Sequence, residues 1–210
     1  LFDRLKWSTQ NCFHEFDKNG KSFLGRDTKA DVVLVSRLKP ALERLNPDAP
    51  AIAVDEAIKI FTQDRSLMSM TAANRDVSDL LKNGILVSFL NAHHEQMSER
   101  IKVIDWETPT NNDFFLASQF WISGDMYTRR ADLVGFVNGI PLLFIELKAS
   151  HRNLKKAYDE NLRDYKSAIP QVFWFNGAIV LSNGSKSVMG TVSAEWEHFC
   201  EWKRINSEGE

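Results

Sequence analysis

The stretch ADLVGFVNGIPLLFIELK, residues 131–148, decides the fold that we expect for this chain. It contains two runs of branched and aromatic residues on either side of Asn138-Gly139, and this dipeptide between apolar runs is the strongest short-range signal of a β-hairpin. Neither run alternates apolar with polar residues, which predicts that other elements cover both faces. We therefore place the two strands in the middle of a central sheet.

Three ionisable residues, Asp132, Glu146 and Lys148, interrupt these apolar runs. An ionised group removed from water costs on the order of several kcal/mol unless it is paired or binds a metal. A two-residue turn would place Glu146 and Lys148 on the face opposite Asp132. A three-residue loop at residues 137–139 would bring all three onto one face and place Asp132 opposite Phe144. A bulge would also bring them onto one face. A shared site therefore requires such an irregularity.

Two carboxylates on one face can share a hard divalent cation, and Mg²⁺ fits best; the backbone carbonyl of Leu147 is a further candidate ligand. A cation there would neutralise a phosphate and activate water, while Lys148 would orient the nucleophile or stabilise the transition state. This pattern predicts hydrolysis of a phosphodiester. The competing interpretation is a buried ion pair between Glu146 and Lys148, with Asp132 capping a strand.

Hydrophobic periodicity predicts an α/β (α+β) fold with a central mixed β-sheet flanked by helices. We expect one domain over residues 1–210, with a mainly helical part at 1–83 and a sheet core at 84–200. The predicted helices are residues 28–45, 51–61, 76–81 and 153–165, and the predicted strands are 85–89, 101–106, 114–122, 132–137, 142–147, 173–181 and 187–192.

The composition, with 43% hydrophobic and 26% charged residues, is typical of a globular domain. Two cysteines, Cys12 and Cys200, are too few for a disulfide framework or a zinc cluster. No apolar run approaches the ~20 residues that cross a bilayer, and the first residues lack a signal-peptide layout. We expect a cytoplasmic protein without a membrane segment.

The net charge of −2 argues against a general nucleic-acid binder, but basic residues gather after the hairpin. The segment from Lys148 to Lys166 contains six basic and three acidic residues. A solvated helix face is the alternative explanation. We predict phosphate contacts without sequence preference from a basic set that comprises Arg129, Arg130, Arg152, Lys155 and Lys156.

At the hairpin the sequence resembles the restriction (motor and nuclease) subunit of type I restriction-modification enzymes, whose N-terminal domain has the fold of PD-(D/E)xK nucleases. The residues Asp132, Glu146 and Lys148 are the specific part of the resemblance. Weaker similarities agree in order and extend it over most of the chain, at residues 27–29, 42–47, 74–84, 182–184 and 190–199.

The resemblance implies a restriction-endonuclease-like fold and a Mg²⁺-dependent type I site-specific deoxyribonuclease acting on double-stranded DNA. It also implies partner subunits for methylation and specificity, and motor domains, absent from this chain, that bind ATP. Gly20-Lys21-Ser22 resembles the end of a phosphate-binding loop, but Glu15 stands where that loop needs glycine, so we expect no ATP site here.

The family usually carries a Gln-x-x-x-Tyr helix motif after the hairpin. Here Tyr165 is kept and Asn161 replaces the glutamine, which puts the positioning of DNA in doubt rather than metal binding. A helix acid such as Glu56 is a further candidate for the metal site. Two alternatives stay open: a catalytically silent module of nuclease fold that docks DNA or partner subunits, and a nuclease of the same fold from a repair or recombination system.

Overall fold

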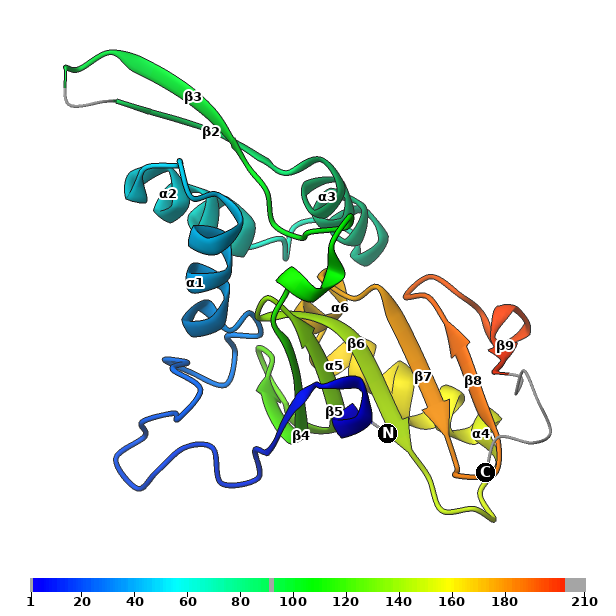
Figure 1. Cartoon of the computed structure of the whole chain (residues 1–210). Helices are drawn as coiled ribbons and strands as arrows, with labels where there is room; N and C mark the ends of the chain where they lie inside the picture. The colour runs from blue at the N-terminus through cyan, green and yellow to red at the C-terminus, as the bar shows by residue number, and fades with distance from the viewer. Residues whose placement is uncertain (1, 91–92, 203–210) are drawn as a thin grey trace.

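The computed structural model describes residues 2–90 and 93–202 and is built around one central β-sheet (Figure 1). In this part of the chain the sheet has seven strands in the order β1-β4-β5-β6-β7-β8-β9. β1 is parallel to β4 and β6 is parallel to β7, whereas the other neighbours are antiparallel, so the predicted central mixed sheet is confirmed. The strands are β1 (Ser8–Asn11), β4 (Phe114–Ser123), β5 (Thr128–Val137), β6 (Ile140–Leu147), β7 (Ala178–Ser182), β8 (Ser187–Gly190) and β9 (Cys200–Glu201).

Three helices and a separate hairpin lie together beyond one end of the sheet (Figure 1). The hairpin projects from the body, and its strands pair with each other and pack on the second helix. No helix in the described residues is long and apolar enough to cross a membrane. The elements are α1 (Val35–Leu45), α2 (Ala51–Thr62), α3 (Met70–Asn83), β2 (Ile85–Leu90) and β3 (Gln96–Ile101).

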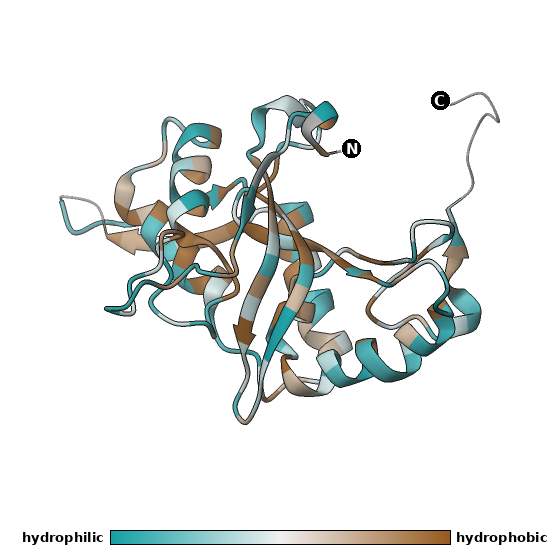
Figure 2. Ribbon diagram, turned by 90° about the horizontal axis from the view of Figure 1, so that it is seen from below, coloured by the Kyte–Doolittle hydropathy of each residue, from teal (hydrophilic) through white to brown (hydrophobic). Residues whose placement is uncertain are grey.

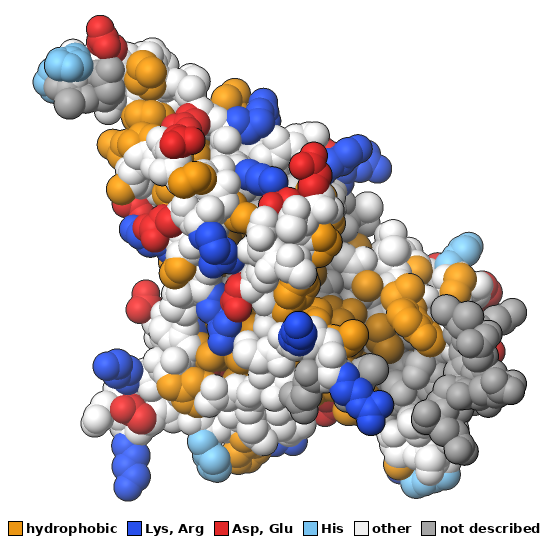
Figure 3. All heavy atoms as spheres, viewed as in Figure 1, with side chains coloured by type: hydrophobic (Ala, Val, Ile, Leu, Met, Phe, Trp, Pro, Cys, Tyr) orange, Lys and Arg blue, Asp and Glu red, His pale blue; other side chains and the backbone are white. Residues whose placement is uncertain are grey.

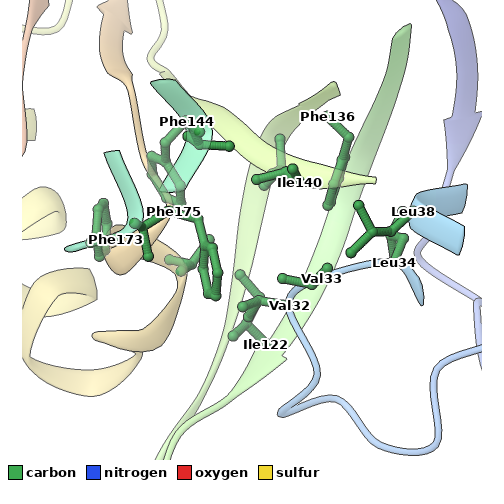
Figure 4. Packing of buried hydrophobic residues seen from close by; sticks show 14 of the residues in the cluster. Val32, Val33, Leu34, Leu38, Ile122, Phe136, Ile140, Phe144, Phe173 and Phe175 are labelled. Carbon is green, nitrogen blue, oxygen red and sulfur yellow. The ribbon is translucent and has the colours of Figure 1, made fainter. Parts of the chain in front are cut away.

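The first predicted helix begins later than expected, at Val35 rather than near residue 28. Residues 32–34 are buried but have no regular secondary structure. Figure 4 shows Val32, Val33 and Leu34 beside the strand residues of the core. These apolar residues therefore pack against the sheet, and the helix starts only after them. The predicted cap is also wrong, because the Thr28 hydroxyl donates to the Asp31 carboxylate at 3.1 Å in a turn of its own.

Two predicted strands need correction, and β1, β9 and all but the last residue of β3 were not predicted. Residues 102–106 follow β3 as a loop, in which the Asp105 carboxylate accepts hydrogen bonds from backbone amides of residues 107 and 108. The strand predicted for residues 173–181 begins only at Ala178, because α6 (Gln171–Trp174) precedes it. β1 lies in the part expected to be mainly helical; its four residues are polar and exposed, so no hydrophobic alternation marks it.

The helix predicted for residues 153–165 covers one side of the sheet in three continuous pieces. It begins at Asn153, whose side chain accepts a hydrogen bond from the Lys155 amide. Its middle is a π-helical turn, and such turns are frequent at functional sites. Figure 2 shows hydrophobic residues concentrated in the strands, while the helices carry more hydrophilic residues. The pieces are α4 (Leu154–Lys156), the π-helical turn (Ala157–Leu162) and α5 (Arg163–Ala168).

The turn of the β5–β6 hairpin is buried against the helical part. The side chain of Asn138 is fully buried, and its Oδ1 accepts a hydrogen bond from the Asp113 amide at 2.8 Å. Its Nδ2 donates to the carbonyl of Val103 at 2.9 Å. The carbonyl of Gly139 accepts from the Leu34 amide at 2.8 Å, directly before α1. This turn therefore fixes both the loop before β4 and the start of α1.

Replacing Gly139 with alanine is expected to lower the free energy of unfolding by about 3 kcal/mol or more. Gly139 has a φ of +77°, and an added Cβ would lie 2.4 Å from the Leu34 carbonyl oxygen and 2.9 Å from the Leu38 amide nitrogen. Gly184 is the matched control, because its φ is +81° and a Cβ there meets nothing within 4 Å. Gly184→Ala should lower it by only about 1 kcal/mol. Equal effects of the two variants in urea unfolding would contradict the role of the buried turn.

Candidate functional site

The turn between β5 and β6 contains two residues. Val137 pairs with Ile140, so the loop contains only Asn138 and Gly139. Both have left-handed backbones, with φ of 51° and 77°, as hairpins with two-residue turns favour. Of the two irregularities that the sequence left open, the three-residue loop therefore does not form.

The irregularity that the site needs is instead a bulge inside β6. Phe136 pairs with Pro141, whereas Gly135 pairs with Leu143, so Leu142 is an extra residue on β6. Proline has no amide hydrogen to donate to the neighbouring strand, and bulges are among the few places where a sheet accepts it. Pro141 therefore explains why the register shifts here.

The bulge brings the two predicted carboxylates to the same level of neighbouring strands. The last pair before the site is Leu133 with Ile145. Continuing this register by one residue places Asp132 opposite Glu146, and residues opposite each other share a face of the sheet. The pairing of Asp132 with Phe144, which only a three-residue loop would give, does not form, and the bulge supplies the required one-residue shift.

Asp132 and Glu146 have different surroundings. Asp132 is half-buried, and its Oδ2 accepts a hydrogen bond from the Leu147 amide at 2.9 Å. The side chain of Glu146 is only 3% exposed. Burial raises the pKa of Glu146 above its ordinary value, and the negative charge of Asp132 raises this pKa further. The two carboxyl groups are thus close enough to repel each other when both are ionised.

Lys148 neutralises only part of this negative charge. Its Nζ donates to Glu146 Oε1 at 2.6 Å, which is the ion pair of the competing interpretation. This contact opposes the rise in the pKa of Glu146. The second oxygen, Oε2, is buried and has no hydrogen-bond partner in the described structure. An acceptor left unpaired in this way is costly, and a cation would satisfy it.

Tyr165 of α5 lies beside the two carboxylates. Its ring packs against Phe144 at a centroid distance of 5.3 Å, and its hydroxyl donates to the Arg130 carbonyl at 3.2 Å. Burial raises the pKa of Tyr165, and the charges of Glu146 and Asp132 raise it further, so the hydroxyl stays protonated at neutral pH. Tyr165 can therefore act here as a hydrogen-bond donor.

The other residues predicted to bind DNA do not form one group around the two carboxylates and Tyr165. Arg129 forms a two-pronged ion pair with Asp164, with N–O distances of 2.6 and 2.8 Å. The Arg130 guanidinium lies over the rings of Phe13 and Trp121. Asn161 is half-buried in the π-helical turn, one helical turn before Tyr165.

Among the exposed basic residues after the hairpin, some are paired and others are free. Lys155 pairs with Asp159 at 2.7 Å. Arg152 and Lys156 are exposed and make no ion pair with the described residues. On the face shown in Figure 3, basic and acidic side chains are interspersed rather than gathered by sign. Unpaired positive charge in this segment therefore comes from individual residues such as Arg152 and Lys156 rather than from a continuous basic patch.

The donor set fits a hard cation with few protein ligands. Within residues 2–90 and 93–202, no three His, Cys, Asp or Glu residues form a possible metal cluster, and Glu56 pairs with Lys59 on α2. Mg²⁺ commonly takes one or two carboxylates and keeps several waters, so Asp132 and Glu146 suffice. The Leu147 amide points toward Asp132, and its carbonyl points to the same side because both groups of a strand residue share one edge.

The sequence reasoning missed two features next to the site. Pro141 inside an apparently central strand was a usable signal of the bulge. Gln119 of β4 lies across from Asp132 and has a φ of 55°, a left-handed backbone in the middle of a strand. No sequence signal marked Gln119, since glutamine is not among the residues enriched in that conformation.

The sequence matches the family model "Type I restriction enzyme R protein N terminus" over residues 1–198. It is 32% identical over 185 residues to the type I restriction enzyme HindI endonuclease subunit of Haemophilus influenzae, covering 86% of this chain and 17% of that protein. It is 26% identical over 190 residues to the provisionally named type I restriction enzyme MjaIXP endonuclease subunit of Methanocaldococcus jannaschii, covering 87% and 18%. The chain thus spans less than a fifth of the length of these relatives. Because the family model extends over nearly the whole sequence, this chain belongs to the family of type I restriction enzyme R protein N-terminal domains.

Proposed function

We propose that this chain is the Mg²⁺-dependent endonuclease domain of a type I restriction enzyme and hydrolyses phosphodiester bonds of double-stranded DNA. The observation that carries the proposal is the buried Glu146 carboxylate, which faces Asp132 and keeps one oxygen without a partner. Two relatives are named endonuclease subunits, which supports a nuclease role. The family membership supports the same assignment.

Asp132, Glu146 and the Leu147 carbonyl would hold the cation. When bound, Mg²⁺ supplies charge neutralisation for the scissile phosphate and activates a water molecule. Both carboxylates are anionic ligands on adjacent strands, so the sheet itself sets their separation. The desolvation that raises the pKa of Glu146 also strengthens its attraction for a cation.

Lys148 and Tyr165 would act on the substrate rather than on the metal. Lys148 Nζ lies next to Glu146, so a cation that takes over the Glu146 charge frees the ammonium group to orient the nucleophile or stabilise the transition state. The protonated hydroxyl of Tyr165, with Asn161 one helical turn earlier, would position DNA by hydrogen bonds.

The intact subunit would work with other components. We infer that methyltransferase and specificity subunits of the same system assemble with it, and that ATP is hydrolysed in motor domains outside this chain. The second candidate function is a catalytically silent docking module. The Lys148–Glu146 ion pair favours it, because it partly neutralises the site without metal. Divalent-ion binding separates the two candidates.

Replacing Asp132, Glu146 or Lys148 with alanine in the intact enzyme is expected to reduce DNA cleavage by about 100-fold or more while ATP hydrolysis continues. Asp132→Ala and Glu146→Ala should also weaken Mn²⁺ binding, because each removes a ligand. Lys148→Ala should still bind Mn²⁺ but fail to cleave. Calorimetric titration and a plasmid cleavage assay measure the two effects. Cleavage at the wild-type rate by Lys148→Ala would show that this division of roles is wrong.

Without divalent ions, Glu146→Gln is expected to raise the melting temperature at pH 7 by a few degrees. The pKa of Glu146 is raised in the folded chain, so its ionised form lowers stability as pH rises through the carboxyl range. At about pH 4 and below the difference should shrink, because Glu146 is then protonated in both states. Thermal unfolding in a chelator at both pH values tests this. A lower melting temperature for the variant at pH 7 would show that the Lys148 ion pair dominates.

Neutralising the free basic residues Arg152 and Lys156 with glutamine is expected to weaken non-specific DNA binding. For every phosphate interaction that a variant removes, the slope of log affinity against log salt should fall by about 0.9. Lys155→Gln is the matched control: Lys155 is already paired with Asp159, so its replacement should have a smaller effect. No effect of Arg152→Gln and Lys156→Gln in a salt titration would assign these residues to solvated surface, and an equal effect of Lys155→Gln would show that its ion pair does not keep it from DNA.

A further inference from the structure

Asp132 is the single residue of β5 that lacks a partner on β4. Ser118 pairs with Leu133 and Phe120 pairs with Ala131, so the residue across from Asp132 is Gln119. The ladder is interrupted at this one position, although both strands continue on either side of it.

The interruption coincides with an unusual backbone. Gln119 has a φ of 55°, and of the non-glycine residues with positive φ in the described chain it is the one inside a strand. Such a conformation is unfavourable for residues with a side chain, and it persists where surrounding structure enforces it, often at functional sites. Within the described residues, the Gln119 side chain makes no hydrogen bond that would explain the conformation.

The break changes which side chains of β4 face the core. Fully buried residues on β4 are two apart before the break, at Phe115 and Ala117, and two apart after it, at Phe120 and Ile122. Across the break, from Ala117 to Phe120, they are three apart. In a regular strand this spacing would place the two residues on opposite faces.

The partner strand β5 shifts in the same way. Ala131 and Val134 are both fully buried and are three residues apart. Unbroken alternation from Val134 would turn Arg130 toward the core and Ala131 away from it. The break allows Arg130 to lie over Trp121 instead. Asp132 lies at the shift: its register with β6 places it on the face of Glu146, and the alternation changes only beyond it, at Ala131.

Asp132 also lacks a ladder partner on β6. The pairing of β5 with β6 ends at Leu133 and Ile145, and beyond it the Leu147 amide donates to the Asp132 carboxylate rather than to a main-chain carbonyl. Asp132 therefore lies between two strands without a ladder partner on either. Its carboxylate lies near that of Glu146, close enough to raise the pKa of the glutamate.

We propose that Gln119 is a positioning residue for the metal site. Its left-handed backbone interrupts the β4–β5 ladder at Asp132 and holds the Asp132 carboxylate beside Glu146. This inference rests on the proposed function, because the position matters for a cation shared by both carboxylates. The role belongs to the backbone of Gln119, so it depends on which residues tolerate a positive φ.

Substitutions at Gln119 in the 210-residue chain test the proposal through Mn²⁺ affinity, measured by calorimetry without DNA. Glycine adopts a positive φ freely and asparagine tolerates it, so Gln119→Gly and Gln119→Asn should bind Mn²⁺ within about 3-fold of wild type. Valine is β-branched and disfavours a positive φ, so Gln119→Val should bind at least about 10-fold more weakly. Ser118→Val is the control, because Ser118 is a half-buried neighbour on β4 with a regular pair.

Each outcome decides a specific point. Wild-type Mn²⁺ affinity in Gln119→Val would overturn the proposal. Equal weakening of Mn²⁺ binding in Gln119→Gly and Gln119→Val would also overturn it, because the effect would then belong to the side chain. Equal weakening of Mn²⁺ binding in Ser118→Val would show that any substitution in this part of β4 disturbs the site, and this result would overturn the proposal too. If Gln119→Val does not fold, Gln119→Ala must bind more weakly than Gln119→Gly. A wild-type chain that binds no Mn²⁺ would refute the metal site itself, and the positioning role with it.

Discussion

The buried turn at Asn138 and Gly139 is the constraint on which the rest of the structure depends. Both residues adopt left-handed backbones, which match the natural twist of a two-stranded hairpin. The Asn138 side chain ties the turn to the loop before β4, and the Gly139 carbonyl ties it to the start of α1. The closed end of the hairpin is therefore fixed inside the protein, and the β5–β6 ladder ends at Leu133 and Ile145, next to the carboxylates.

Comparing two buried glutamates explains why one is structural and the other is available for chemistry. Glu15 accepts hydrogen bonds on Oε1 from Ser22 and Arg26, and its Oε2 is also paired with Arg26. Arg26 in turn donates to the backbone carbonyl of Trp121, which ties the long loop before α1 to β4. Glu15 is thus fully satisfied within the fold. Glu146 is equally buried, but only one of its oxygens has a partner.

Local signals predicted the parts of the fold that depend on local chemistry. The Asn138-Gly139 turn, the helix beginning near Ala51 and the helix beginning after Asn153 all follow from turn residues, periodicity and capping. Residues 32–34 do not form the predicted helix, because apolar spacing cannot distinguish a helix face from a segment packed on a sheet. β1 could not be predicted, because an exposed polar edge strand has no hydrophobic alternation.

The candidate site divides in the same way. The sequence predicted which residues carry charge, and it predicted that a one-residue shift had to occur between Asp132 and Glu146. The prediction did not place that shift at Leu142, although the neighbouring Pro141 was a usable signal, because proline in a central strand favours a bulge. Nor could it reveal the backbone of Gln119, since that conformation is imposed by neighbouring strands rather than favoured by glutamine itself.

The π-helical turn at residues 157–162 takes up one residue that a regular α-helix would not hold. A π-helical turn accommodates one residue more than an α-helical turn, so a one-residue deletion there would restore a regular α-helix. Each residue of an α-helix turns the chain by about 100°. Because the turn absorbs this rotation, Tyr165 would keep its contact with Phe144 and Asp164 its ion pair with Arg129 after such a deletion. The same deletion between the turn and Tyr165 would swing the tyrosine away, so the π-helical turn is where this helix can change its length without losing the contact.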